Sequence, residues 1–188
     1  KVQRKAFLDE TRELSEAEYK QLLEAAQAKG NERLYLVMLT ICGTGIRVSE
    51  LQYITVEAAK NGRAEICMKG KNRTVLLQKG LRGRLLKYAE ELGIDNGHIF
   101  RTRSGRPLDR TNICHDMKKL CASARVDSCK VFPHNLRHLF ATVYYRIYKD
   151  IVKLADILGH SSIETTRIYL LTTGQEHRQQ LERLRLVL

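Results

Sequence analysis

The sequence lacks the features that mark membrane, secreted and disulfide-stabilised proteins. None of its apolar runs approaches the roughly 20 residues of a membrane-spanning helix, and its first residues are polar and charged, so it shows no signal peptide or membrane anchor. Its five cysteines are odd in number and form no C-x-x-C pair, which argues against a disulfide framework and against a zinc knuckle. We therefore expect a cytoplasmic or nucleoid protein with reduced cysteines and no membrane partner.

Acidic residues are few relative to basic ones. There are 21 Asp and Glu against 33 Lys and Arg, so the formal net charge is +12. This excess suggests a polyanionic partner such as nucleic acid, although charge alone does not separate DNA from RNA or from an anionic membrane. With 43% hydrophobic residues, the chain has the composition of one compact domain over residues 1–188. Because it begins at Lys1 instead of Met, we expect a fragment of a longer protein.

Most of the chain has helical periodicity. A capping box at Ser15 predicts an amphipathic helix over residues 15 to 29. An almost wholly apolar stretch predicts a buried helix over residues 32 to 42, which Gly43 and Gly45 interrupt. Further helices are predicted over residues 79 to 92, 109 to 125, 134 to 148, 150 to 158 and 175 to 186.

One segment has the periodicity of strands instead. Alternating apolar residues predict a β-hairpin over residues 63 to 78, with a basic tip from Lys69 to Arg73. Ile99-Phe100 is a candidate third short strand. The predicted fold class is therefore mainly α with a small antiparallel β-sheet, an α+β arrangement.

Arg47 is the first candidate for chemistry. It follows Thr44-Gly45-Ile46 at the end of the buried helix, so the turn can hold its guanidinium against the protein body. A fixed guanidinium suits bidentate phosphate binding. The alternative is a local ion pair with Glu50, of a kind common on protein surfaces.

A second candidate stretch begins at Pro133, where proline favours entry into a helix. His134 and Arg137 then lie at i and i+3 on one face of its first turn, where the helix dipole also favours an anion, so both can address one phosphate. The alternative is a capped helix start with solvated basic side chains. His134 and His138 have metal-ligand spacing, but no H-E-x-x-H arrangement or third ligand accompanies them, so we expect no zinc site.

A third candidate stretch is a glycine-capped corner between two helices. Leu158-Gly159 ends one helix and Ser161-Ser162 opens the next, which places His160 at the corner. Tyr169 follows nine residues later. A lone tyrosine is more often a packing residue than a nucleophile, so chemistry at Tyr169 depends on its neighbours.

These stretches together resemble the signature boxes of the tyrosine recombinases. The boxes are the run from Thr44 to Leu51, His134-x-x-Arg137, Leu158-Gly159-His160 and Tyr169, in that order and at matching spacing. The resemblance covers nearly the whole chain. It is closest to the Xer-type recombinases of bacteria and to the integrases of phages and integrative transposons, and it implies the tyrosine recombinase catalytic-domain fold.

The resemblance implies an active site built from two arginines, a lysine, two histidine-type positions and a tyrosine. On this sequence these are Arg47, Lys69, His134, Arg137, His160 and Tyr169. The family often places the lysine in a G-K-G-x-K context, whereas this hairpin tip is shortened, so Lys71 is a rival to Lys69. Glu50 is similar to the family's acidic partner of the first arginine, and Lys71 and Arg73 are expected to contact DNA.

The resemblance also implies a reaction without metal, cofactor or ATP. Tyr169 would attack the scissile phosphate and form a 3′-phosphotyrosine, from which a 5′-hydroxyl later rejoins the strand. Arg47 and Arg137, with a hydrogen bond from His160, would stabilise the transition state. Lys69 would protonate the 5′-oxygen, and His134 would assist proton transfer or brace the phosphate.

The implied partners are double-stranded DNA, other recombinase subunits in a tetramer on two DNA sites, and accessory proteins. An N-terminal DNA core-binding domain is expected to precede this chain, and the bacterial nucleoid is the expected location. The predicted helix over residues 175 to 186 has one apolar side that either docks on a neighbouring subunit or packs on its own domain.

Two other functions fit parts of the sequence. A type IB topoisomerase resembles this fold and relaxes DNA through the same tyrosine chemistry, but the Xer-like boxes and the C-terminal tail favour recombination. A non-catalytic DNA-binding regulator would fit the helices and the charge equally well. It does not account for both arginines, both histidines and the tyrosine, because neutralising phosphates needs no such set.

Overall fold

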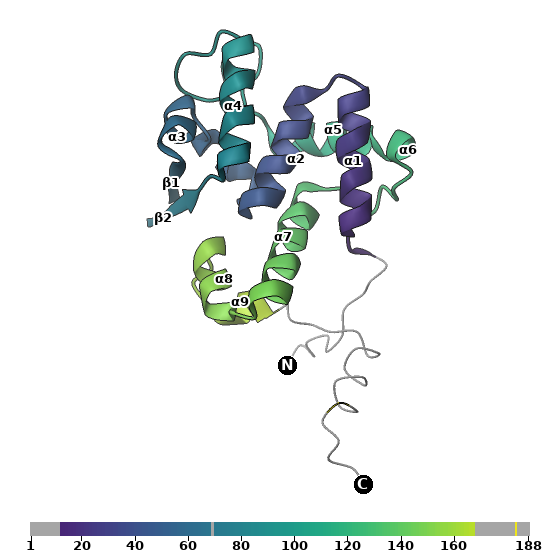
Figure 1. Ribbon diagram of the computed structural model, residues 1–188, viewed down its shortest axis with the longest axis vertical. Coiled ribbons are helices and arrows are strands. Elements are labelled where there is room, and N and C mark those ends of the chain that lie inside the picture. The colour runs from purple at the N-terminus through teal and green to yellow at the C-terminus, as the bar shows by residue number, and fades with distance from the viewer. Residues whose placement is uncertain (1–11, 69, 168–182, 184–188) are drawn as a thin grey trace.

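The computed structural model describes residues 12–68, 70–167 and 183. Figure 1 shows α1 (Glu16–Ala28), α2 (Glu32–Thr44) and α4 (Lys79–Glu91) beside one another, with α7 (Pro133–Tyr148) below them and leading to α8 (Ile151–Leu158) and α9 (Ile163–Thr166). The strands β1 (Arg63–Met68) and β2 (Lys71–Leu76) pair antiparallel beside α3 (Val56–Asn61). The predicted class, mainly α with a small antiparallel sheet, is confirmed. Within the described ranges no helix has both the length and the apolar character to cross a membrane.

The ends of the first two helices follow from their sequence. The Ser15 hydroxyl accepts from the Glu18 N–H at 3.1 Å and the Glu18 carboxylate accepts from the Ser15 N–H at 2.8 Å, so the predicted capping box is present. α2 ends at Gly45, which is left-handed with φ 69°. The prediction that Gly43 interrupts α2 is wrong, because tertiary packing against α1, α4 and α7 outweighs the cost of about 1 kcal/mol for glycine in a helix.

Helix α2 lies at the centre of the hydrophobic core. It packs against α1, α4 and α7, and most of its side chains are buried. A smaller cluster joins α7 to α8 through the buried residues Ala141, Leu154 and Leu158. The position of α8, which carries the corner at His160, therefore depends on its packing against α7.

Two predicted elements differ from the structure. Ile99 and Phe100 form no strand; isolated bridges flank them, and the two side chains are buried at 1% and 0% exposure. Their apolar character therefore indicated burial and not pairing. The helix predicted over residues 109 to 125 is split into α5 (Arg110–Lys118) and α6 (Cys121–Ala124), because the Leu120 N–H bonds to the carbonyl three residues earlier. The helix predicted over residues 175 to 186 lies outside the described residues.

The hairpin tip is shorter than predicted. Met68 pairs with Lys71, and Ile66 pairs with Arg73, so the turn consists of two residues. Gly70, with φ 73°, supplies the positive φ that such a turn requires. Arg73 thus belongs to β2 and not to the tip.

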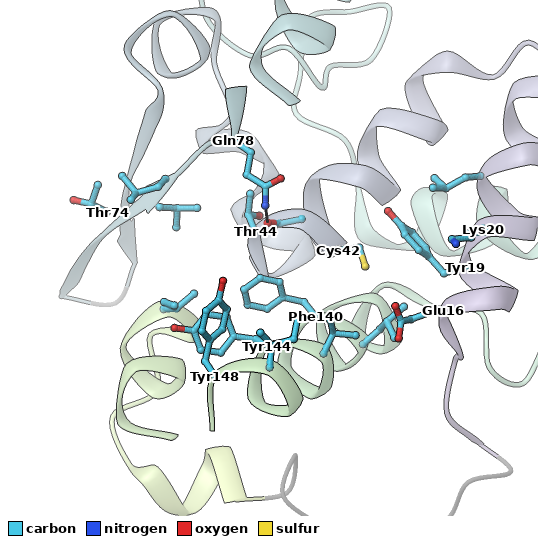
Figure 2. Close-up of a pocket in the computed structure, with 18 residues that line it drawn as sticks. Glu16, Tyr19, Lys20, Cys42, Thr44, Thr74, Gln78, Phe140, Tyr144 and Tyr148 are labelled. Carbon is cyan, nitrogen blue, oxygen red and sulfur yellow. Dashed lines mark hydrogen bonds between the residues drawn. The ribbon is translucent and has the colours of Figure 1, made fainter. Parts of the chain in front are cut away.

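An apolar groove of about 740 Å³ runs beside α7. Figure 2 shows Phe140 and Tyr144 of α7 opposite Thr44 and Gln78 across this groove. None of the described residues predicted for the active site lines this groove.

Candidate active site

A cavity of about 750 Å³ collects most of the described residues that the sequence singled out. It lies between the 3-10 helix η2 (Val48–Tyr53), the hairpin and the corner after α8. Four predicted residues line it: Arg47, Glu50, Arg73 and His160. Other residues in its wall are Ser49, Ile66, Met68, Asn72, Asp156, Gly159, Ser161 and Thr165.

Arg47 is held by the carboxylate of Glu50. Its backbone N–H donates to Oε2 at 2.7 Å, and its Nη1 donates to Oε1 at 3.0 Å. The Glu50 side chain is 2% exposed, whereas that of Arg47 is 43% exposed. The ion pair with Glu50 and the fixed guanidinium of Arg47 are therefore the same arrangement. Glu50 holds the guanidinium, which still faces solvent.

Arg73 also binds Glu50, which corrects its predicted position at an exposed tip. Its Nη2 donates to Glu50 Oε2 at 2.6 Å, and its Nη1 donates to the carbonyl of Ile157. The side chain is 14% exposed because β2 directs it toward the protein and not along the tip. Burial lowers the pKa of Arg73, while the charge of Glu50 opposes that shift. An arginine nevertheless stays charged.

Arg137 is buried within the protein beside this cavity, at 2% exposure. Its Nη1 donates to the carbonyl of Gly45 at 2.6 Å, and its Nη2 donates to the carbonyl of Leu158 at 2.8 Å. Its Nη2 also lies 2.8 Å from Nε2 of His160. One guanidinium therefore joins the C-terminal ends of α2 and α8 and the imidazole at the corner.

The bonds of His160 fix its tautomer. An arginine cannot accept a hydrogen bond, so Nε2 of His160 accepts from Arg137, and the proton resides on Nδ1. Nδ1 then donates to the buried Thr166 hydroxyl at 2.9 Å. Burial, followed by the charges of Arg137, Arg47 and Arg73, lowers the pKa of His160 to about 4. The ring is therefore neutral at pH 7.

His134 lies on the first turn of α7. Partial burial and the charges of Arg137, Arg110 and Arg47 lower its pKa, which favours a neutral imidazole. The N-cap residue of α7, Phe132, makes no side-chain capping bond, and Pro133 and Asn135 of the first turn are buried.

The remaining predicted residues are not tested by the geometry. Lys69 and Tyr169 lie outside the described residues. Lys71 is described through its backbone, as the first residue of β2 opposite Met68. The choice between the two lysines and the role of Tyr169 stay predictions.

Several members of the site escaped sequence reasoning. Thr166 was not singled out, although a hydroxyl residue near the corner histidine was a signal for it. The carbonyls of Gly45, Ile157 and Leu158 carry no sequence signal, because any residue supplies one. Across the described part of the chain, no group of three or more His, Cys, Asp or Glu side chains is placed to hold a metal ion.

The electrostatics of the site favour an oxyanion. The guanidiniums of Arg47 and Arg73 bind Glu50, the buried carboxylate of the described network, and that of Arg137 lies beside His160, while Asp156 at the cavity wall is exposed. Both histidines are shifted toward their neutral forms. A phosphate that entered this cavity would meet fixed donors in partly buried surroundings, where charge-assisted bonds are strong.

Comparison with known proteins identifies relatives that share this sequence and fold. The sequence profile of the phage integrase family matches residues 12–176. The tyrosine recombinase XerA of Pyrococcus furiosus is 30% identical over 181 residues, which cover 93% of this chain and 62% of that recombinase.

Two solved structures have the same arrangement of elements. The crystal structure of XerA recombinase gives a TM-score of 0.76 at 30% identity, with 94% of this chain and 64% of that chain covered. The XerH site-specific recombinase bound to its difH substrate in a pre-cleavage complex gives 0.73 at 26% identity, with 90% and 53% covered. This chain therefore spans less than two thirds of the length of each relative.

Proposed function

Since the chain belongs to the phage integrase family and has the fold of a tyrosine recombinase catalytic domain, we propose that it is the catalytic part of a site-specific DNA recombinase. It cleaves and rejoins double-stranded DNA through a 3′-phosphotyrosine at Tyr169, without metal or ATP. The observation that carries this proposal is the set of bonds that fixes Arg47, Arg137 and His160 around one cavity.

Arg47 and Arg137 bind the scissile phosphate in this proposal. Glu50 holds the half-exposed guanidinium of Arg47, and two carbonyls hold that of Arg137, so little reorganisation is needed when the phosphate arrives. Such preorganised donors stabilise the extra negative charge of a pentacoordinate transition state.

The covalent step exchanges one phosphoester for another. The Tyr169 oxygen forms a bond to phosphorus as the bond to the 5′-oxygen breaks. The tyrosine proton passes to His134, which a lowered pKa keeps neutral, or to solvent while His134 braces the phosphate. Lys69, or Lys71 in its place, donates a proton to the departing 5′-oxygen. Attack by a 5′-hydroxyl of a partner strand reverses the step, so no ATP is required.

His160 changes its hydrogen bonding when the phosphate binds. In the described structure its Nε2 accepts from Arg137, so it cannot donate to an anion there. A phosphate beside the ring would oppose the charges that depress its pKa and so favour a proton on Nε2. Both Arg137 and His160 would then donate to the phosphate.

The complete protein acts with partners beyond this chain. We place four subunits on two DNA sites and an N-terminal DNA core-binding domain before Lys1. The proposed setting is the cytoplasm, at the nucleoid, with chromosome or mobile-element DNA as substrate and accessory proteins setting the outcome.

The first prediction is a covalent adduct that depends on Tyr169. The full-length protein is incubated in EDTA with a nicked suicide substrate from the flanks of its own gene, and adducts are separated on denaturing gels. We expect an adduct with the wild type and with Tyr148→Phe, a matched exposed tyrosine on α7, and none with Tyr169→Phe.

The other outcomes distinguish the rival functions. An adduct that leads only to relaxed plasmid, with no two sites joined, would favour a type IB topoisomerase. Tight binding to DNA without any adduct would favour a DNA-binding regulator and would contradict the proposal.

A further inference from the structure

We propose that Arg73 is a positioning residue of the cleavage site, which aligns Arg47 and His160 without touching DNA. This inference rests on the proposed function and deepens it. It replaces the sequence prediction that Arg73 contacts DNA from the hairpin tip.

Arg73 and Arg47 share one buried carboxylate, that of Glu50. Glu50 Oε1 accepts from Arg47 Nη1 at 3.0 Å, and Glu50 Oε2 accepts from Arg73 Nη2 at 2.6 Å. Because the Glu50 side chain is 2% exposed, water does not replace a lost partner readily. Oε2 also accepts from the Arg47 backbone N–H at 2.7 Å, so without Arg73 the buried carboxylate would keep that bond but lose one of its two charged partners, and the guanidinium of Arg47 would shift with it.

Arg73 also binds the C-terminal end of α8. The last carbonyls of a helix have no partner within the helix. Here the carbonyl of Ile157 accepts from Arg73 and that of Leu158 accepts from Arg137. Two guanidiniums therefore fix two consecutive carbonyls just before the chain turns through Gly159 to His160.

Gly159 provides an independent sign that this place is shaped for Arg73. Its φ is +64°, a conformation that L-residues rarely adopt. A Cβ atom at this position would lie 2.5 Å from Cδ and 2.7 Å from Nε of Arg73. The glycine thus allows both the tight corner and the approach of the arginine, so adding a methyl group there would displace Arg73 without removing its charge.

The burial of Arg73 indicates that it positions other residues of the site and does not contact DNA. Its side chain is 14% exposed, against 65% for Arg63 in the paired strand. It lies on the same hairpin as both candidate lysines and bonds to α8, so it links the parts of the site that would carry Lys69, Arg47 and His160. Loss of Arg73 should therefore slow cleavage while leaving DNA affinity unchanged.

The test measures DNA affinity and the single-turnover rate of adduct formation separately, with the full-length protein and the suicide substrate. For Arg73→Met we expect a dissociation constant within about twofold of wild type and cleavage slower by about 10- to 100-fold, because small misplacements of catalytic groups have effects of that size. Arg73→Lys keeps the charge but loses the planar guanidinium that binds Glu50 and the Ile157 carbonyl together. Its cleavage rate should therefore lie between those of Arg73→Met and wild type. Arg63→Met is the matched control in the same hairpin and should match wild type in both measurements.

Two further variants test the same contacts of Arg73 with Gly159 and Glu50. Gly159→Ala should slow cleavage as Arg73→Lys does, and it serves with that variant if Arg73→Met fails to fold. Adding Glu50→Gln to Arg73→Met should slow cleavage by less than the product of the two single effects, because both act through one contact. Equal losses of affinity and rate in Arg73→Met would show a DNA contact and overturn the inference, as would cleavage at the rate of Arg63→Met. Absence of a Tyr169-dependent adduct in the wild type would instead be the failure of the proposed function itself.

Discussion

The protonation state of His160 follows from its burial and from its described hydrogen-bond partners. Arg137 occupies the lone pair of Nε2, and Thr166 takes the proton of Nδ1, so a second proton on the ring would break the bond to Arg137. Burial is the largest cause of the lowered pKa of His160, about 4, and the charge of Arg137 is the next. Without an anion in the site, His160 therefore cannot be protonated at Nε2 while it accepts the hydrogen bond from Arg137.

This constraint predicts a pH dependence of stability. The pKa of His160 is lowered from 6.5 to about 4 in the folded chain, so between these values the unfolded chain binds more protons. The stabilisation is present above pH 6.5 and is lost as the pH falls toward 4. After discounting for solvent exposure, the Tm of the wild type should fall by about 2–4 °C more than that of His160→Asn between pH 7 and pH 5. Equal falls in thermal unfolding of the two proteins would contradict the assignment.

The turn from α2 into η2 is the element that brings the two binding arginines together. Gly45 ends α2 with φ 69°, its carbonyl accepts from Arg137, and Arg47 follows two residues later. A Cβ atom on Gly45 would lie 2.5 Å from the ring of Phe140. The turn thus needs glycine both for its backbone conformation and for the close approach of α7.

Gly45→Ala should therefore destabilise the protein more than a change of φ alone explains. Gly30→Ala is the matched control, because Gly30 has φ +64° with nothing within 4 Å of the added Cβ. We expect about 1–2 kcal/mol of destabilisation for Gly30→Ala and about 1–3 kcal/mol more for Gly45→Ala, measured by urea unfolding. Similar losses in both variants would show that Phe140 moves aside at no cost.

The elements differ in how far the sequence could predict them. The capping box of α1 and the alternation of β1 are local signals, and both are confirmed. The split between α5 and α6 and the burial of Ile99 and Phe100 depend on tertiary packing, so local patterns gave the wrong structure there.

The site shows the same division. The motif boxes indicated Arg47, Arg137 and His160 through their order, and the structure brings these three residues together. The backbone carbonyls that hold Arg137 lie 92 and 21 residues away along the chain, so no local pattern could reveal them. Arg73 was misplaced for a similar reason, because the hairpin register decides whether it belongs to the tip or to the strand.

At the scale of the whole molecule, the residues behind the net charge of +12 include exposed arginines outside the cavity. The turn before α5 carries the exposed Arg103 and Arg106, and α5 begins at the exposed Arg110. Arg110 lowers the pKa of His134, which places this end of α5 near the candidate site. We expect this basic turn to contact phosphates beside the scissile one.

Removing that charge should weaken DNA binding and change its salt dependence. For Arg103→Gln combined with Arg106→Gln, the slope of log K against log salt should become less steep by about 0.9 for each lost phosphate contact. The cleavage rate at saturating DNA should stay near that of wild type. Lys87→Gln is the comparison, since Lys87 is exposed on α4 and pairs with Glu91. An unchanged slope in the double variant would place the turn away from DNA.

Three guanidiniums, those of Arg47, Arg73 and Arg137, lie near His160, and Glu50 pairs with the first two, so this part of the molecule carries an excess of positive charge. Without DNA, Glu50 offsets only part of this positive charge. A bound phosphate supplies the missing negative charge, so the substrate completes the electrostatics of the folded state as well as the chemistry. DNA binding should therefore stabilise the folded protein in addition to positioning the scissile phosphate.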